Sequence, residues 1–376
     1  MAKVSVDERT IAADLRRVTV VVPTYSRPAS VRRQVEYWGN RGPSLLILDG
    51  SEQEMGIDFV SNLPENVRYV HSVTSFSHRR MIAADYVSTE FTILLPDDEF
   101  HLESGLGNCI RYLDQHPDVI GCGGKVLGFF VEQGEFRAFH GYDDWLRFPD
   151  DCVTIRERLD FALPPKKAHK VECSLFRSEA WKQIFRESYS DQYSCGFTYE
   201  RLLNLYAAVL GRTELIDSVL WMRSLENPPT HSVDAPRLDR NNFVAWATSD
   251  EFRDEVDHYF AKAQKILRTS GELSEQEIDT YARRFLFGGI QRQIDKEARS
   301  QQGLKHKLGK LAIAHGPSFV KRAAKRIVPS RFLRFTGWRG DRMSTVMELL
   351  QSRGIYCSPS DMDRVARLAL ATARAR

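Results

Sequence analysis

The sequence lacks the patterns that mark disulfide-rich, secreted and membrane-spanning proteins. Its six cysteines, in 376 residues, form no CxxC pair, so we expect buried thiols in a reducing compartment rather than disulfides or a zinc site. The start, MAKVSVDERT, has no apolar core of a secretion signal, and no run reaches the ~18 apolar residues of a membrane span. We therefore expect a cytoplasmic protein.

Several catalytic signatures are also missing. The glycines and the lysine of GCGGKVLG (121–128) satisfy neither the GxGxxG pattern of dinucleotide-binding folds nor the phosphate-binding loop pattern. We predict a strand end and a turn there instead. The sequence contains no GxSxG and no HExxH, the motifs of one class of serine hydrolase and of zinc proteases.

Acidic residues are missing from one long segment. The net charge is only +3, yet residues 301–340 hold ten Lys and Arg and no Asp or Glu. The stretch PSFVKRAAKRIV (317–328) predicts an amphipathic helix with its basic residues on one face, suited to an anionic membrane surface. An ordinary surface helix packed on the rest of the protein is the alternative. Cationic patches also attract nucleic acid, but no groove-reading or base-stacking motif supports a specific nucleic-acid partner.

What the sequence does contain is an alternation of β-prone runs and helical patterns. Strands are predicted at 18–22, 44–48, 67–71, 91–95 and 119–122, and helices at 29–38, 76–87 and 103–115. These βαβ units predict an α/β fold, with a mostly parallel sheet covered by helices on both faces.

The pattern changes further along the chain. It loosens after Gly124 and recovers in VECSLF (171–176), followed by helices near 178–186 and 198–210 and a strand at 215–223. Beyond about residue 242 the pattern is almost entirely helical, without a convincing strand, and the last segment begins with a helix-capping sequence at Ser358. We expect two domains, residues 1–235 with the sheet and residues 236–376 with the helices.

Three consecutive acidic residues follow the fourth strand. Asp97, Asp98 and Glu99 end the stretch FTILLPDDE, and ligands of such sheets bind at the carboxyl ends of the strands. Like charges repel there, so either solvent or a cation must offset them. A solvated turn is one interpretation. The other is a site for Mg²⁺ or Mn²⁺, which bind hard oxygen ligands and often share them with substrate phosphates.

Four motifs, in order, resemble the nucleotide-sugar-dependent glycosyltransferases of the GT-A fold, specifically the family 2 type. The motifs are VVVPTYSRP (20–28), similar to a PTYNR-like turn, LILDGSE (46–52), similar to a D-G-S turn, the basic helix FSHRRMIAADYVST (76–89), and LLPDDEF (94–100), similar to a DxD-type motif. The resemblance extends over roughly residues 16–230. It implies a GT-A, Rossmann-like fold followed by a helical C-terminal region.

The resemblance also implies a function. A sugar would move with inversion from a nucleotide-sugar donor to a hydroxyl acceptor, a glycan or a lipid-linked molecule. The setting would be bacterial surface polysaccharide or glycoconjugate synthesis, peripheral to the inner face of the membrane. The implied donor-binding residues are Pro23, Thr24, Tyr25, Arg27, Asp49, Ser51, Arg79, Arg80, Asp97, Asp98 and Arg223.

Individual roles follow from the same resemblance. Asp49 would accept a hydrogen bond from the nucleobase. Arg79 or Arg80 would reach the diphosphate, with a solvated helix face as the alternative for this pair. Mn²⁺ or Mg²⁺ would be held by Asp98 and Glu99, and it would stabilise the leaving nucleotide. Glu99 stands where the family more often has Asp, which lengthens the side chain.

Two further roles are a third metal ligand and a catalytic base. His231 in PPTHSVD would serve the metal, with a solvated loop as the alternative. Inversion requires a carboxylate to take the acceptor proton. Glu200 stands eleven residues before Gly211. In the family, the Asp of an ED pair stands eleven residues before a Gly, so Glu200 takes the position of that Asp. Asp191 is the other candidate, and a Glu that only favours the helix dipole is the non-catalytic interpretation of Glu200.

Two rival functions stay open. Nucleotidyl transfer on a related α/β sheet is disfavoured, because no glycine-rich basic loop follows the first strand. A catalytically silent glycosyltransferase-like domain that binds a membrane or a partner is favoured by Tyr199, which replaces the usual Glu of the ED pair.

Overall fold

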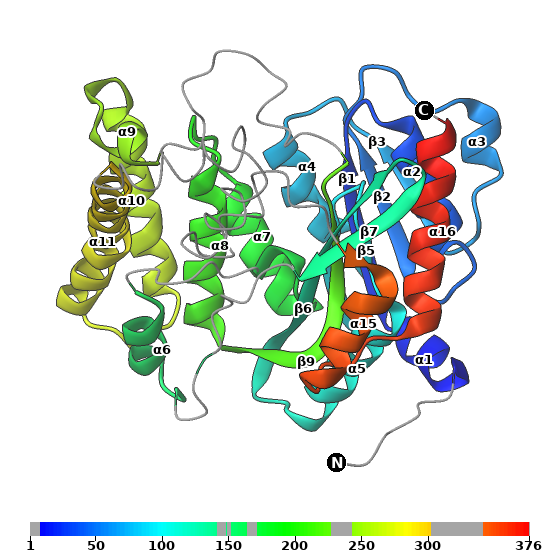
Figure 1. The fold of residues 1–376 in the computed structure, drawn as a ribbon. Helices are drawn as coiled ribbons and strands as arrows, with labels where there is room; N and C mark the ends of the chain where they lie inside the picture. The colour runs from blue at the N-terminus through cyan, green and yellow to red at the C-terminus, as the bar shows by residue number, and fades with distance from the viewer. Residues whose placement is uncertain are drawn as a thin grey trace.

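The structure of the chain is a computed structural model. It describes residues 8–140, 148, 152–163, 171–226, 243–301 and 341–375. Its strands form one mixed sheet, in the order β10-β7-β6-β8-β4-β1-β2-β3, with β5 and β9 off this path. Helices cover both faces. Figure 1 shows α2 and α16 on one side of the strands and α4, α7 and α8 on the other, with α10 and α11 beyond α8.

The predicted parallel part of the sheet is confirmed. Its strands are β1 (Val18–Thr24), β2 (Ser44–Asp49), β3 (Val67–His71) and β4 (Phe91–Leu94), and the helices between them are α2 (Pro28–Trp38), α3 (Ile57–Ser61) and α4 (Phe76–Ile82). Neighbours in the order β4-β1-β2-β3 are all parallel. The helix predicted at 76–87 ends earlier, at Ile82, and continues as the 3-10 turn Ala83–Asp85.

The other half of the sheet departs from the prediction only in part, since the strands predicted at 119–122 and 215–223 lie within β6 and β9. Its strands are β5 (Phe100–His101), β6 (Val119–Glu132), β7 (Glu135–His140), β8 (Leu175–Arg177), β9 (Arg212–Ser224) and β10 (Asp341–Arg342). Strand β8 is antiparallel to β4 and β6, β6 and β7 form a hairpin, and β9 runs parallel to β6. The short strand β10, antiparallel to β7, lies in a region predicted to be almost entirely helical, without a convincing strand.

The turn predicted at 121–128 is wrong, because these residues lie inside β6. The glycines there answer a packing requirement. A Cβ at Gly121 would collide with the ring of Phe176, and a Cβ at Gly128 would collide with the ring of Phe139. Glycine inside a strand often marks such a close approach.

Alternate residues of the strands enter two cores. Val20 of β1 belongs to the core under α1 (Glu8–Leu15), α2, α5 (Glu103–Gln115), α15 (Met343–Ser352) and α16 (Pro359–Ala375). Its neighbour Val21 belongs to the core under α4, α6 (Ile155–Ala162), α7 (Ser178–Tyr189) and α8 (Phe197–Leu210). Because both faces are buried, the parallel strands appear in the sequence as continuous apolar runs.

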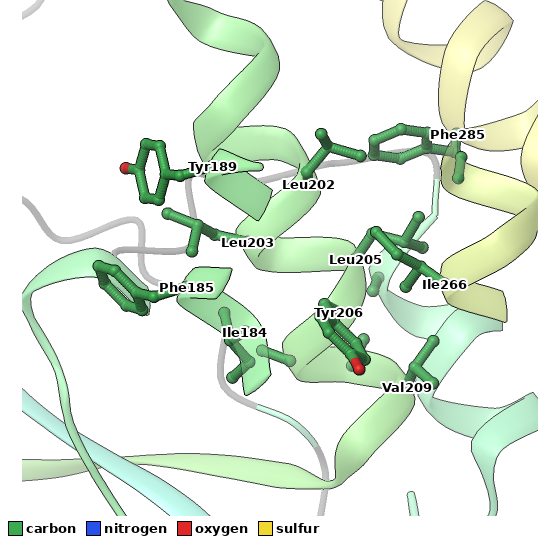
Figure 2. Close-up of a cluster of buried hydrophobic side chains, with 14 of the residues drawn as sticks. Ile184, Phe185, Tyr189, Leu202, Leu203, Leu205, Tyr206, Val209, Ile266 and Phe285 are labelled. Carbon is green, nitrogen blue, oxygen red and sulfur yellow. The ribbon is translucent and has the colours of Figure 1, made fainter. Parts of the chain in front are cut away.

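The helices after residue 242 share these cores. They include α9 (Phe243–Thr248), α10 (Arg253–Arg268) and α11 (Glu275–Gln301). Figure 2 shows Ile266 and Phe285 directed toward Leu205 and Leu202 of α8. The predicted domain boundary at residue 235 and the basic segment 317–328 lie outside the described residues. Within them, no helix combines the length and the apolar character needed to cross a bilayer.

Candidate functional site

The predicted donor-binding residues lie at one edge of the sheet. Thr24 at the end of β1 is in register with Asp49 at the end of β2, and β4 runs parallel beside β1. The carboxyl ends of these three strands therefore meet, and the segments that follow them surround one place. Pro23 and Thr24 are buried, whereas Tyr25 is 52% exposed at this edge.

The acidic turn after β4 is tied to the end of β1. Asp97 accepts a hydrogen bond from the Thr24 hydroxyl at 2.7 Å and pairs with the Arg27 guanidinium at 2.9 Å. The same Arg27 nitrogen lies 3.3 Å from Asp98. Burial raises the pKa of Asp97, and the neighbouring Asp98 charge adds to this, against the opposing effect of Arg27 and Thr24. Asp98 keeps 13% of its side chain exposed, so it is the carboxylate of this pair that is more open to a ligand.

Glu99 points to the opposite side of the turn. Strand β5 pairs with β9, which brings Trp221 beside Glu99. The indole Nε1 of Trp221 donates a hydrogen bond to the Glu99 carboxylate. Arg223, two residues further along β9, lies 4.0 Å from the other carboxylate oxygen. Glu99 is therefore held by β9, and Arg223 reaches the same edge of the sheet.

Helix α2 holds the backbone of the acidic turn. Gln34 donates through Nε2 to the carbonyls of Asp97 and Glu99, at 3.0 and 2.7 Å. Arg33 donates through Nη2 to the carbonyl of Asp98 at 2.7 Å. Both side chains are buried. The sequence analysis did not identify these two residues, although Gln34 occupies a position at helical spacing from apolar Val31 and Trp38, a position that faces the core.

A second polar network orients Asp49. One carboxylate oxygen accepts hydrogen bonds from the amide and the hydroxyl of Ser51, and the other accepts from the Tyr69 hydroxyl at 2.7 Å. The Ser51 hydroxyl oxygen also accepts from the amide of Ser26 at 2.8 Å. Tyr69, on β3, is another residue that the sequence analysis did not identify. The network joins the turns after β1 and β2.

Arg79 is buried beside this network. Its guanidinium packs against Gly50, where a Cβ would collide with it, and donates to the carbonyl of Thr74. Burial lowers the pKa of Arg79 despite the nearby Asp49 charge. Within the part of the chain that the structure describes, its Nε has no hydrogen-bond partner. A buried guanidinium with an unused donor suits an anionic ligand.

Arg80 has protein partners instead. Its Nη1 donates to the Glu172 carboxylate and to the Tyr189 hydroxyl, and its guanidinium lies over the ring of Phe76, 3.7 Å from the centroid. Neither arginine thus lies on the solvated helix face that was the alternative. Arg80 instead anchors α4 to α7.

The two candidate bases lie in different surroundings. Asp191 pairs with Lys262 of α10 at 2.9 Å and lies 3.6 Å from His258. Burial raises the pKa of Asp191, but its hydrogen bond and ion pair with Lys262 outweigh that effect and leave the pKa lowered. Glu200 lies in the first turn of α8. Tyr189, the residue that contacts Arg80, has a raised pKa. Burial is the main cause, and the Glu200 charge makes a smaller contribution.

Tyr199 occupies the position of the family's usual Glu. Its ring stacks on Tyr189 with centroids 5.1 Å apart. Its hydroxyl accepts a hydrogen bond from the amide of Tyr193 at 3.1 Å. Tyr199 therefore orders the segment before α8.

The donor set at the acidic turn fits a hard divalent cation in one binding mode. Among the described residues, no group of three or more His, Cys, Asp or Glu side chains is placed to hold a metal ion. A Mg²⁺ or Mn²⁺ site of one or two carboxylates completed by substrate phosphates needs no such group. Asp98, partly exposed, offers one such carboxylate, whereas the Glu99 carboxylate is directed to Trp221 and Arg223. His231, the third predicted ligand, lies outside the described residues.

Comparison with known proteins gives structural neighbours only. No protein-family model and no curated protein matches the chain. The structure of S. aureus TarS 1-349 in complex with UDP-GlcNAc matches with a TM-score of 0.45 and 14% identity over 96% of this chain and 92% of that chain. The same protein in complex with UDP matches with a TM-score of 0.44 and 14% identity, over 96% of this chain and 92% of that chain. Longer S. aureus TarS gives a TM-score of 0.36 and 16% identity over 94% of this chain and 54% of that chain. At these scores the likeness assigns neither a family nor a ligand.

Proposed function

We propose that this chain is an inverting glycosyltransferase of GT-A, family 2 type, which moves a sugar from a nucleotide-sugar donor to a hydroxyl acceptor. The observation that carries the proposal is the convergence of three features at the carboxyl edge of the parallel strands. These are the acidic turn at Asp97–Glu99, the oriented carboxylate of Asp49, and the buried guanidinium of Arg79.

The donor would lie across the ends of β1, β2 and β4. Asp49, oriented by Ser51 and Tyr69, would accept an N–H of the nucleobase. Pro23, Thr24 and Tyr25 would line the nucleotide. Arg79, whose guanidinium lies against Gly50 beside Asp49, would supply a planar cationic donor to the diphosphate. Arg80, already held by Glu172 and Tyr189, would position α4 rather than bind phosphate.

A divalent cation is part of this proposal. Asp98 would hold Mn²⁺ or Mg²⁺ together with the phosphates of the donor, with His231 as a further ligand. Glu99 would join them only by exchanging its hydrogen bond with Trp221 for the cation. When bound, such a cation offsets the charge that develops on the leaving diphosphate. Arg223 lies near Glu99 and would add positive charge on the β9 side.

We assign the base to Glu200. It lies in the first turn of α8, and its charge acts on Tyr189, which contacts Arg80 of α4, the helix that follows β3. Asp191 is the weaker candidate, because its ion pair with Lys262 stabilises the ionised form and so lowers its basicity. Glu200 would take the proton of the acceptor hydroxyl as that oxygen attacks the sugar.

The biological setting rests on resemblance. We propose bacterial surface polysaccharide or glycoconjugate synthesis, with a glycan or lipid-linked acceptor and a peripheral position at the membrane. The basic composition of residues 301–340 supports attraction to anionic lipid.

The test is release of nucleoside diphosphate from a panel of nucleotide sugars with Mn²⁺ or Mg²⁺ and an acceptor extract. We expect turnover with one donor class. Asp98→Asn should abolish this activity, and Glu200→Gln should lower the rate of turnover by roughly 10²–10⁴-fold. Asp58→Asn, a change at an exposed Asp of α3, is the matched control. Release of sugar phosphate, with the nucleoside monophosphate transferred to the acceptor, would indicate nucleotidyl transfer. Nucleotide binding without turnover of any donor would indicate the silent domain favoured by Tyr199.

A further inference from the structure

Arg27 lies between two carboxylates of the acidic turn. Its Nη1 lies 2.9 Å from one oxygen of Asp97 and 3.3 Å from one oxygen of Asp98. The Arg27 side chain is 26% exposed, whereas that of Asp97 is only 6% exposed. The guanidinium is thus the more exposed partner of this ion pair.

The backbone before Arg27 is built to direct it there. Ser26 has a φ of 54°, in the left-handed region that residues with a Cβ seldom adopt. The hydroxyl of Ser51 accepts a hydrogen bond from the amide of Ser26 and holds this conformation. Pro28 follows as the first residue of α2 and fixes the chain on the other side. The position of Arg27 is therefore set by the turns after both β1 and β2.

Electrostatics explains why the free protein needs a cation at this point. Two adjacent carboxylates, one of them buried, repel each other and are poorly solvated. A guanidinium between them offsets that cost. A divalent cation held by Asp98 would need the carboxylate that Arg27 contacts at 3.3 Å, so Arg27 and a metal compete for Asp98 while no further anion is present. A diphosphate brings additional negative charge, and a guanidinium binds phosphate oxygens through two donors at once.

We propose that Arg27 is the resident counter-cation of the acidic turn in the donor-free protein, and that metal and diphosphate binding together move its guanidinium from Asp98 to the diphosphate. The inference rests on the proposed function and deepens it. Metal alone binds weakly, because it must displace Arg27. Metal and diphosphate bind cooperatively, because the diphosphate accepts the displaced guanidinium. By linkage, each raises the affinity for the other by the same factor.

The test is titration of the full-length protein with Mn²⁺ alone, followed by electron paramagnetic resonance of free Mn²⁺, and then repeated with UDP, GDP, CDP or ADP. We expect Arg27→Gln to bind Mn²⁺ alone about tenfold more tightly than wild type, with a smaller gain on adding the nucleotide. The matched control is Arg32→Gln, which removes an exposed arginine of α2 that packs over Phe59. We expect it to behave as wild type, which separates local competition from a change in net charge.

Several results would overturn the inference. If Arg27→Gln and wild type bind Mn²⁺ equally, with and without nucleotide, Arg27 does not compete with the metal although the metal site stands. If neither binds Mn²⁺ under any of these conditions, the metal part of the proposed function fails as well. A second variant, Arg27→Lys, guards against misfolding of Arg27→Gln. It keeps a positive charge but lacks the planar guanidinium, so we expect its Mn²⁺ affinity to lie between those of wild type and Arg27→Gln. If Arg27→Lys binds Mn²⁺ alone no more tightly than wild type does, the inference is contradicted.

Discussion

At the scale of single residues, the site depends on what surrounds each charged group. Asp97, Asp98 and Glu99 are consecutive in the chain, yet they face Thr24, the solvent side and Trp221 respectively. Their position after a strand predicts that all three lie at the site. Their partners are not predictable from that position, because they come from β1 and β9, which are distant in the sequence.

Arg79 and Gly50 provide a prediction at this scale. Replacing Gly50 by Ala puts a Cβ where the Arg79 guanidinium lies, so we expect the flexible guanidinium to move away. Gly50→Ala and Arg79→Gln should each weaken binding of the cognate nucleoside diphosphate by about tenfold, the loss of one charge-assisted hydrogen bond. The double variant should be no weaker than Arg79→Gln alone, since both changes act through one group. Isothermal titration calorimetry measures all three affinities.

Gly56→Ala is the control for that cycle, because a Cβ there meets no atom within 4 Å. We expect it to bind as wild type does. Additive losses in the double variant would show that Gly50 and Arg79 act separately, and would remove Arg79 from the diphosphate site.

At the scale of elements, side chains of helix α2 donate hydrogen bonds to the backbone carbonyls of Asp97, Asp98 and Glu99. Gln34, fully buried, bridges the carbonyls of Asp97 and Glu99. Replacing Gln34 by Met keeps the length of the side chain but leaves both carbonyls without this donor, which costs about 2 kcal/mol of stability. We also expect weaker binding of Mn²⁺ with nucleotide, because the turn loses its fixed shape.

Urea unfolding and the Mn²⁺ titration measure the two effects of Gln34→Met. The control is Gln53→Met, which changes an exposed residue and should alter neither. A variant with unchanged stability and unchanged metal binding would show that the turn keeps its shape without α2.

Lys262 joins α10 to the end of α7 and gives a pH-dependent prediction. It lies 2.9 Å from both Glu187 and Asp191 and is 6% exposed. Burial raises the pKa of each carboxylate, but the hydrogen bonds and charge of Lys262 outweigh it, so both pKa values are lowered. A lowered pKa contributes stability above the ordinary pKa, and that stability is lost as the pH falls through the folded-state value.

We therefore expect Lys262→Met to cost about 2 kcal/mol near pH 7. The difference from wild type should shrink as the pH falls below about 4, where the carboxylates of the unfolded chain take up protons. Urea unfolding from pH 3 to pH 7 measures it. A constant difference over that range would mean that Lys262 stabilises only through packing.

Prediction of the elements succeeded where one physical pattern dominated. The strands of the parallel part are continuous apolar runs bounded by turns, so β1 to β4 were found nearly to the residue. The hairpin of β6 and β7 was missed because Gly121 and Gly128 signal a turn locally, whereas the rings of Phe176 and Phe139 require glycine there. That requirement exists only once the strands are paired.

At the scale of the whole molecule, the described parts of the chain share two cores. Val365 of α16 packs in the core that contains Val20 of β1, and Ile266 of α10 packs in the core that contains Val21. Sequence periodicity predicted these C-terminal helices, but not the face of the sheet that each would cover. Because both cores include the strands that end at the site, we expect a ligand bound there to stabilise the entire described fold.

The most direct test of the central claim, that a nucleoside diphosphate and a divalent cation bind together at the ends of β1, β2 and β4, is thermal unfolding of the purified chain. The panel contains nucleoside diphosphates and monophosphates, each with and without Mn²⁺ or Mg²⁺. A ligand that binds only the native state raises the melting temperature by mass action. We predict a rise with one diphosphate that requires the cation and disappears in Asp98→Asn. A panel without any rise, or a rise that Asp98→Asn retains in full, would contradict the account.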